Sequence, residues 1–130
     1  MAGELILIVE DNERNLKLAR DVLEFAGYRT LAATCGEDAL AVARDGRPDL
    51  VLMDVQLPGI DGVAALGLLR RSPDLAATPV VAVTAFAMKD DRARFLAAGF
   101  DAYVEKPISV RELPLQVRDA LETHRTRARP

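Results

Sequence analysis

The chain has 130 residues, of which 50% are apolar and 28% charged, and its formal net charge is −3 at neutral pH. This length suits one domain with one core. The slight acidity favours neither nucleic acid nor anionic lipid as a partner, and no apolar run approaches the roughly 20 residues that a membrane-spanning helix needs. A single cysteine excludes a disulfide framework and a multi-cysteine metal site. We therefore expect a cytoplasmic domain that binds neither nucleic acid nor membrane directly.

Short apolar segments predict five β-strands, at residues 5–9, 30–33, 50–53, 80–83 and 102–104. The first, third and fourth are continuously apolar, as expected for strands buried on both faces. Between and after them lie segments with helical periodicity, at residues 16–26, 39–43, 63–69, 95–99 and 110–121. Gly27 is expected to end the first helix, and Ser109 to cap the last one with Glu112 as its capping-box partner. Five alternations of strand and helix predict an α/β fold with a parallel sheet and helices on both faces.

Polar side chains follow four of the five predicted strands. Glu10 and Asp11 follow the first, Asp54 the third, Thr84 the fourth and Lys106 the fifth. The carboxyl ends of parallel strands meet at one edge of the sheet, where open α/β sheets bind ligands. Each residue alone could be a helix cap or a surface residue. Three carboxylates in one crevice, however, repel one another unless a cation or a proton separates them.

These residue types point to phosphoryl chemistry assisted by a metal ion. A ligand set made only of oxygens favours Mg²⁺, which usually takes one or two carboxylates together with a phosphate oxygen. Thr84 and Lys106 supply a hydroxyl donor and a positive charge that suit the other phosphoryl oxygens. Asp54 is then left as a carboxylate nucleophile that could form an aspartyl phosphate.

The segments that carry these residues resemble the receiver domain of bacterial response regulators, the CheY-like superfamily. The match covers Leu5 to about Leu121 and rests on LIVEDN (7–12), DLVLMDVQLPGIDG (49–62), VAVTA (81–85), AGFDAY (98–103) and KPI (106–108). Residues 83–90 are similar both to single-domain regulators of the DivK type and to receivers of hybrid sensor kinases. The resemblance implies a flavodoxin-like five-stranded parallel sheet in the order 2-1-3-4-5. It assigns residues 1–122 to the receiver domain and leaves 123–130 as a short basic tail.

The same resemblance assigns roles to the site residues. It implies that Asp54 is the phosphoacceptor and that Thr84 and Lys106 contact the phosphoryl group. Four residues are implied to hold Mg²⁺, directly or through water: Glu10, Asp11, Asp54 and, by its backbone carbonyl, Gln56.

Further positions are implied to control the output. Tyr103, nineteen residues after Thr84, falls at the aromatic switch position of the family. The Lys106–Pro107 bond falls where the family usually has a cis peptide, and X-Pro bonds are the common place for one. Gln56 and Phe86 lie two residues after the phosphoacceptor and after Thr84, and we expect both to tune the lifetime of the phosphorylated state.

The implied function is that of a single-domain response regulator. A sensor histidine kinase or a histidine phosphotransfer protein would donate the phosphoryl group, and the face of the fourth helix, fifth strand and fifth helix would bind a downstream target. Two questions stay open: whether the domain instead passes the phosphoryl group on as a relay shuttle, and whether it is a monomer or a phosphorylation-promoted dimer. Apart from its own phosphorylation and dephosphorylation, no enzymatic activity is expected.

Two other classes are disfavoured. A phosphatase with an aspartate nucleophile needs a second acid two residues later, where Gln56 stands. A flavodoxin-like FMN carrier needs a phosphate-binding loop after the first strand, where Glu10 and Asp11 would repel phosphate without a metal ion.

Overall fold

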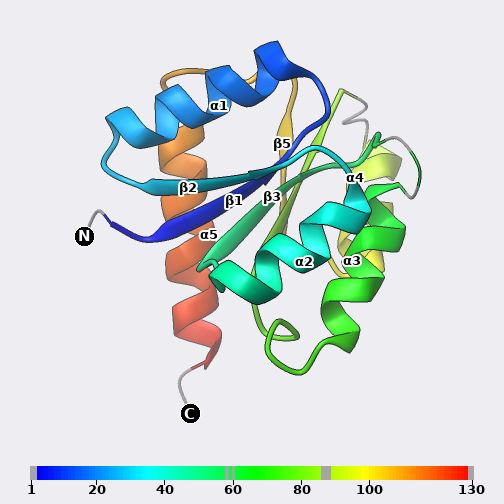
Figure 1. Cartoon of the computed structure of the whole chain (residues 1–130). Helices are drawn as coiled ribbons and strands as arrows, with labels where there is room; N and C mark the ends of the chain where they lie inside the picture. The colour runs from blue at the N-terminus through cyan, green and yellow to red at the C-terminus, as the bar shows by residue number, and fades with distance from the viewer. Residues whose placement is uncertain (1–2, 58, 60, 86–88, 129–130) are drawn as a thin grey trace.

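The fold is built on a parallel sheet of five strands. The computed structural model describes residues 3–57, 59, 61–85 and 89–128. The strands are β1 (Leu5–Val9), β2 (Arg29–Ala33), β3 (Leu50–Asp54), β4 (Val80–Thr84) and β5 (Ala102–Glu105). They pair in the order β2-β1-β3-β4-β5, and every neighbouring pair is parallel (Figure 1). This order and the α/β class confirm the predicted fold.

Five helices cover the two faces of this sheet. They are α1 (Glu13–Phe25), α2 (Gly36–Gly46), α3 (Gly62–Arg71), α4 (Lys89–Ala98) and α5 (Leu113–Ala128). Helices α1 and α5 share one apolar cluster with the sheet, and α2, α3 and α4 share another on the opposite face (Figure 1). The prediction of helices on both faces is therefore confirmed.

The continuous apolar runs follow from this three-layer arrangement. In β1, Ile6 and Ile8 pack into the cluster of α1 and α5, whereas Leu7 and Val9 pack into that of α2, α3 and α4. All four side chains are buried, because successive residues of a strand point to opposite faces and both faces are covered. A strand with one face in water would alternate apolar and polar residues instead.

The last helix begins later than the sequence suggested. The Ser109 hydroxyl accepts a hydrogen bond from the Glu112 backbone N–H at 3.2 Å, but the α-helix starts only at Leu113. In a regular helix from residue 110, the N–H of residue 114 would donate to the Val110 carbonyl. Pro114 has no N–H, so this hydrogen bond cannot form. Helix α5 then runs to Ala128, so the expected boundary after residue 122 falls inside it. None of the helices in the described residues is long and apolar enough to cross a membrane.

Candidate functional site

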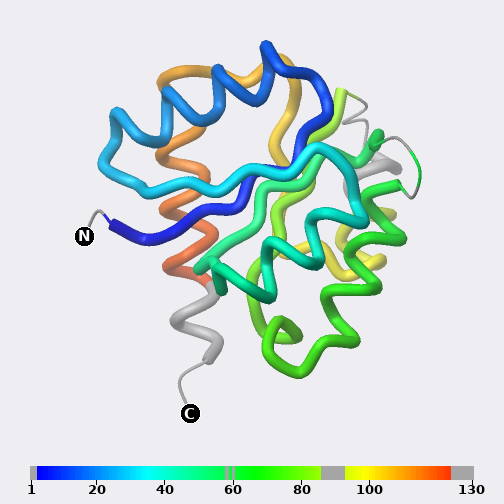
Figure 2. Tube along the Cα trace, viewed as in Figure 1, coloured from blue at the N-terminus to red at the C-terminus, as the bar shows by residue number. Residues whose placement is uncertain are grey.

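The polar residues singled out by the sequence lie together at one edge of the sheet. Figure 2 shows that the chain leaves β1, β3 and β4 at the same edge. Glu10 directly follows β1, Asp54 and Thr84 end β3 and β4, and Lys106 directly follows β5. Glu10, Asp54 and Thr84 are 4%, 3% and 1% exposed, whereas Asp11 is exposed. Two acids are therefore held in a part of the molecule that water barely reaches.

Lys106 joins the two buried carboxylates. Its Nζ lies 2.8 Å from Asp54 Oδ2 and 3.2 Å from Glu10 Oε1. Its backbone N–H donates to the Thr84 carbonyl at 2.8 Å, which ties the end of β5 to the end of β4. One ammonium group thus contacts both carboxylates, and the pairing of β4 with β5 fixes the backbone that carries it.

The remaining carboxylate oxygens accept hydrogen bonds from the loops that follow the strands. Asp54 Oδ1 accepts from the Gln56 backbone N–H at 2.9 Å, and Glu10 Oε2 accepts from the Asn12 backbone N–H at 3.2 Å. Asn12 also caps α1, because its side chain accepts from the Asn15 N–H at 3.0 Å. The capping role of Asn12 was not predicted from the sequence, although an Asn just before a helical pattern is a recognisable cap signal.

Burial and mutual repulsion change the proton affinity of these groups. Burial, then the hydrogen bond and charge of Asp54, raise the pKa of Glu10 from 4.5 to about 7, against the opposing Asn12 N–H and Lys106 charge. Burial alone would lower the pKa of Lys106, but the hydrogen bonds and charges of Asp54 and Glu10 outweigh it, so the net shift is upward. Lys106 therefore stays charged at neutral pH, and the Glu10 carboxyl keeps its proton to a higher pH than an ordinary glutamate does.

The acidic oxygens are spaced for one metal ion. Glu10, Asp11 and Asp54 each offer a carboxylate oxygen, and these atoms lie within 4.8 Å of one another. Such a set fits a hard divalent cation, Mg²⁺ above all. The charges agree with this fit, because Lys106 contacts only two of the three carboxylates and Glu10 keeps a proton where a cation could bind.

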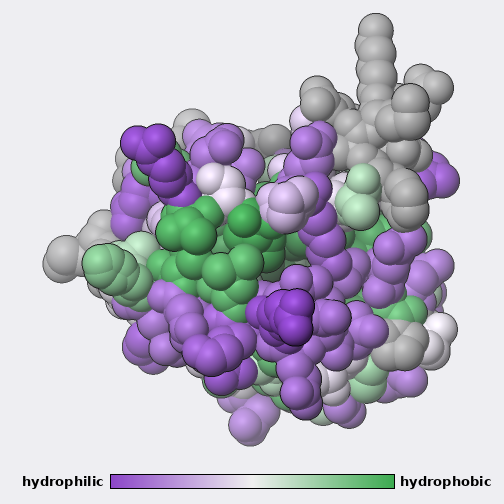
Figure 3. All heavy atoms as spheres, turned by 90° about the horizontal axis from the view of Figure 1, so that it is seen from above, coloured by the Kyte–Doolittle hydropathy of each residue, from purple (hydrophilic) through white to green (hydrophobic). Residues whose placement is uncertain are grey.

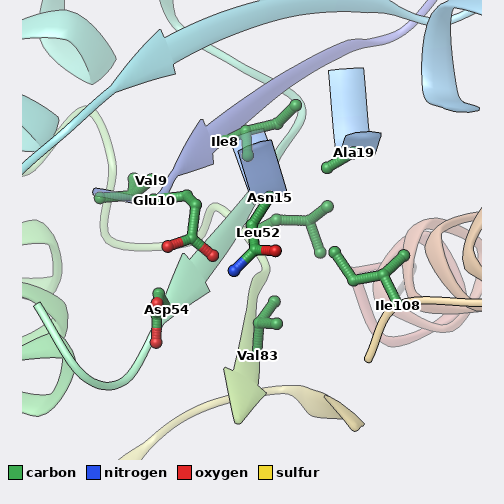
Figure 4. Close-up of a pocket in the computed structure, with 9 residues that line it drawn as sticks. All are labelled: Ile8, Val9, Glu10, Asn15, Ala19, Leu52, Asp54, Val83 and Ile108. Carbon is green, nitrogen blue, oxygen red and sulfur yellow. The ribbon is translucent and has the colours of Figure 1, made fainter. Parts of the chain in front are cut away.

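The inner side of the site is apolar. A small cavity of about 10 Å³ lies beside the carboxylates, roughly the room that one water molecule needs. Figure 4 shows the side chains that line it. Glu10, Asp54 and Asn15 supply its polar atoms, and the other lining side chains are aliphatic: Ile8, Val9, Ala19, Leu52, Val83 and Ile108. This apolar wall explains why burial is the largest cause of the raised Glu10 pKa.

The other predicted positions surround this centre. Tyr103 pairs with Ala82 across β4 and β5 and is half-buried against the cluster of α2, α3 and α4. Gln56 is exposed at the rim. The Lys106–Pro107 bond is cis, as the resemblance implies. Phe86, expected to tune the phosphoryl lifetime, lies outside the described residues.

Comparisons with known proteins agree with this architecture. The chain is 50% identical over 105 residues to the polar-differentiation response regulator DivK of Brucella anthropi, which covers 81% of this chain and 85% of that protein. The receiver domain of sensor histidine kinase PA1611 from Pseudomonas aeruginosa, with a magnesium ion coordinated in its active-site cleft, aligns with a TM-score of 0.84 at 35% identity, covering 93% of this chain and 99% of that one.

A second solved structure gives the same result. The receiver domain of a signal transduction histidine kinase from Syntrophus aciditrophicus aligns with a TM-score of 0.82 at 33% identity, covering 93% of this chain and 92% of that one. A family model described as the response regulator receiver domain matches residues 6–118. The chain therefore belongs to the response regulator receiver domain family and is a two-component signalling protein of the CheY-like type.

Proposed function

We propose that Asp54 is the phosphoacceptor of this receiver domain and that Glu10, Asp11, Asp54 and the Gln56 carbonyl hold Mg²⁺. The observation that carries the proposal is the setting of Asp54: one oxygen is held by the Gln56 N–H at 2.9 Å and the other by Lys106 at 2.8 Å, beside the cluster of acidic oxygens. When bound, the metal ion would neutralise charge on the transferring phosphoryl group.

The chemistry needs little covalent help from the protein. The P–N bond of a phosphohistidine on the donor breaks and a P–O bond to an Asp54 carboxylate oxygen forms. The bond pair stays on the donor nitrogen, and the histidine, which carries a proton on its other ring nitrogen, leaves as the neutral imidazole. Lys106 exchanges one of its carboxylate contacts for a phosphoryl oxygen, and the Thr84 hydroxyl donates to another. Water later cleaves the phosphoryl group from Asp54, which releases inorganic phosphate and restores the carboxylate.

The donor must bring its phosphohistidine to the rim of this site. Figure 3 shows an apolar area on the upper face, bordered by hydrophilic residues. A groove of about 310 Å³ on this face is lined by α1 and by the segments after β4 and β5, through Asn15, Leu18, Ala85, Lys106, Pro107 and Ile108. Because Lys106 belongs both to this groove and to the site, a kinase or phosphotransfer helix packed on Leu18 and Ile108 would lie next to Asp54.

The output is proposed to leave through the face of α4, β5 and α5. Phosphorylation adds roughly −1.5 to −2 charges and strong acceptors, which draw Thr84 toward the phosphoryl group and let Tyr103 turn inward. Tyr103, Leu96 and Gln116 line a groove of about 480 Å³ on this face. A downstream target, or a second copy in a phosphorylation-promoted dimer, would then meet a surface that depends on the state of Asp54.

A regulator is favoured over a relay shuttle. The curated relatives at 50% identity are named as response regulators. The lifetime of the aspartyl phosphate, which we propose is tuned by Gln56 and Phe86, separates the two roles. A Phe86→Glu substitution should speed the loss of phosphate, because a carboxylate admits the water that a bulky apolar ring excludes; an unchanged rate would remove Phe86 from this role.

Intact-mass measurement tests the proposal directly. The protein with Mg²⁺ and a small acyl phosphate should gain one phosphoryl group, and the gain should vanish in Asp54→Asn and with EDTA. Some receivers accept only from their kinase, so the complementary measurement is the NMR spectrum with Mg²⁺ and beryllofluoride, which mimics the acyl phosphate. The proposed function would be refuted if the protein gained no mass and its spectrum showed no change at the site.

A further inference from the structure

The first residue of α3 lies against the backbone that carries Asp54. The Gly62 N–H donates to the Val55 carbonyl at 2.9 Å, and the Val55 N–H donates to the Val83 carbonyl of β4 at 3.1 Å. Val55 is therefore held from two sides directly after Asp54. The next residue, Gln56, turns back so that its N–H reaches Asp54 Oδ1.

Gly62 has no room for a side chain. A Cβ at this position would lie 2.7 Å from the Asp54 carbonyl oxygen, 2.7 Å from the Val55 Cα and 3.3 Å from the Val55 carbonyl oxygen. All three are backbone atoms of the loop that leaves β3, so none can move away by a change of rotamer. Ordinary contact between carbon atoms needs about 3.5–4.0 Å, so a methyl group would push the two segments apart by about 1 Å.

Gly67, in the same helix, provides the contrast. A Cβ there would meet only Arg71 Nη2, at 3.8 Å, which is ordinary contact with the end of a flexible side chain. The close approach is thus specific to the end of α3 that faces the site, and it is not a general property of glycines in this helix.

We propose that Gly62 is a positioning residue for the phosphoacceptor loop. Its missing side chain lets α3 close on the Asp54–Val55 peptide, and this contact fixes both the Asp54 carboxylate and the Gln56 carbonyl. The inference rests on the proposed function, in which these two groups hold Mg²⁺ and the first accepts the phosphoryl group. A displacement of about 1 Å at a reacting group can slow a reaction about a hundredfold.

Three matched variants test this role. Gly62→Ala pushes on the loop, Gly67→Ala makes the same chemical change without a clash, and Asp61→Ala weakens the start of α3 by removing the acceptor of the Ala64 N–H at 2.8 Å. For each variant we would measure unfolding in urea, Mg²⁺ affinity by calorimetry, and the initial rate of phosphorylation by a small acyl phosphate at saturating Mg²⁺.

We expect Gly62→Ala to lose at least tenfold in both Mg²⁺ affinity and phosphorylation rate. Gly67→Ala should stay within twofold of the unmodified protein, and Asp61→Ala should lose stability yet keep both quantities within about threefold. Wild-type affinity and rate in Gly62→Ala would overturn the proposal. So would equal losses in Asp61→Ala, because they would show that any weakening of α3 has the same effect.

Hydrogen exchange of the unmodified protein covers the case in which Gly62→Ala does not fold. If α3 and the loop act as one unit, the N–H groups of Gly62 and Gln56 should exchange at similar rates, and Mg²⁺ should slow both. Independent exchange of the two groups would overturn the proposal. If the unmodified protein binds Mg²⁺ but neither takes a phosphoryl group nor responds to beryllofluoride, the proposed function fails, and the Mg²⁺ affinities alone still decide the role of Gly62.

Discussion

The raised pKa of Glu10 makes the domain sensitive to pH, and Glu10→Gln is the perturbation that reveals it. Between pH 4.5 and 7 the folded metal-free protein keeps a proton that the unfolded chain has lost. The folded state then binds more protons, so the free energy of unfolding falls as the pH rises through this window. Since each tenfold change in proton affinity corresponds to about 1.4 kcal/mol, the cost approaches about 3 kcal/mol above pH 7.

Metal-free Glu10→Gln should therefore match the unmodified protein at pH 5 and be the more stable of the two at pH 8, by about 1–3 kcal/mol. Urea denaturation in the presence of EDTA measures this difference at each pH. Glu105→Gln is the control, because Glu105 is an exposed carboxylate at the end of β5. A Glu10→Gln variant that is no more stable than the unmodified protein at pH 8 would refute the assignment of the buried proton to Glu10.

The same proton must leave when Mg²⁺ binds. At pH 6 most molecules carry it, so calorimetry in two buffers of different ionisation enthalpy should detect release of close to one proton per Mg²⁺. The affinity should rise about tenfold per pH unit up to about pH 7 and then level off. In Glu10→Gln the affinity should be lower, because a proposed ligand is lost, and its pH dependence should be nearly flat. No proton release by the unmodified protein at pH 6 would contradict this reasoning.

Three further predictions concern stability. Asp101→Asn should cost about 2 kcal/mol in urea, because Asp101 Oδ2 lies 2.9 Å from Nη2 of the half-buried Arg70; unchanged Mg²⁺ affinity is expected, and a large loss would show coupling to the site. Asn12→Ala removes the cap of the Asn15 N–H and should cost about 1 kcal/mol; an unchanged urea midpoint would contradict it. Phe95→Ala should cost about 3–5 kcal/mol, because this ring is 2% exposed in the cluster of α2, α3 and α4. A loss below 1 kcal/mol in the same assay would contradict this, because it would mean that neighbouring side chains fill the cavity.

The strands could be predicted from apolar runs in the sequence, but their order and the start of α5 could not. Apolar runs such as residues 50–53 identify strands buried on both faces, because a strand in a three-layer structure has no water-facing side. The order of the strands does not follow from these runs, since a buried apolar strand can pair with any other; only the family resemblance supplied it. The start of α5 differs from the prediction because Ser109 has the features of a cap, whereas Pro114 disfavours a regular first turn before Leu113.

The site was predictable in membership but not in geometry. The end of each strand brings Glu10, Asp54, Thr84 and Lys106 to one edge, and the sequence shows which residues stand there. Lys106 contacts two carboxylates at once because of how the side chains pack, and the spacing of residues in the sequence does not show this. The role proposed for Gly62 was hidden for a similar reason. Its close contacts would be with backbone atoms at the end of β3, whereas the sequence suggests only a turn at this position.

The metal-free site combines features that stability alone would not favour. Two buried carboxyls contact one ammonium group, burial raises the pKa of Glu10, and the exposed Asp11 adds a third acid nearby. Replacing a buried ion pair by apolar residues is often neutral or stabilising, so such an arrangement is expected where function requires it. A divalent cation would relieve the repulsion, and the phosphoryl group that we propose for Asp54 would require Lys106 to change partners. The same crowding of charge that costs stability thus makes the contacts of the site depend on what is bound there.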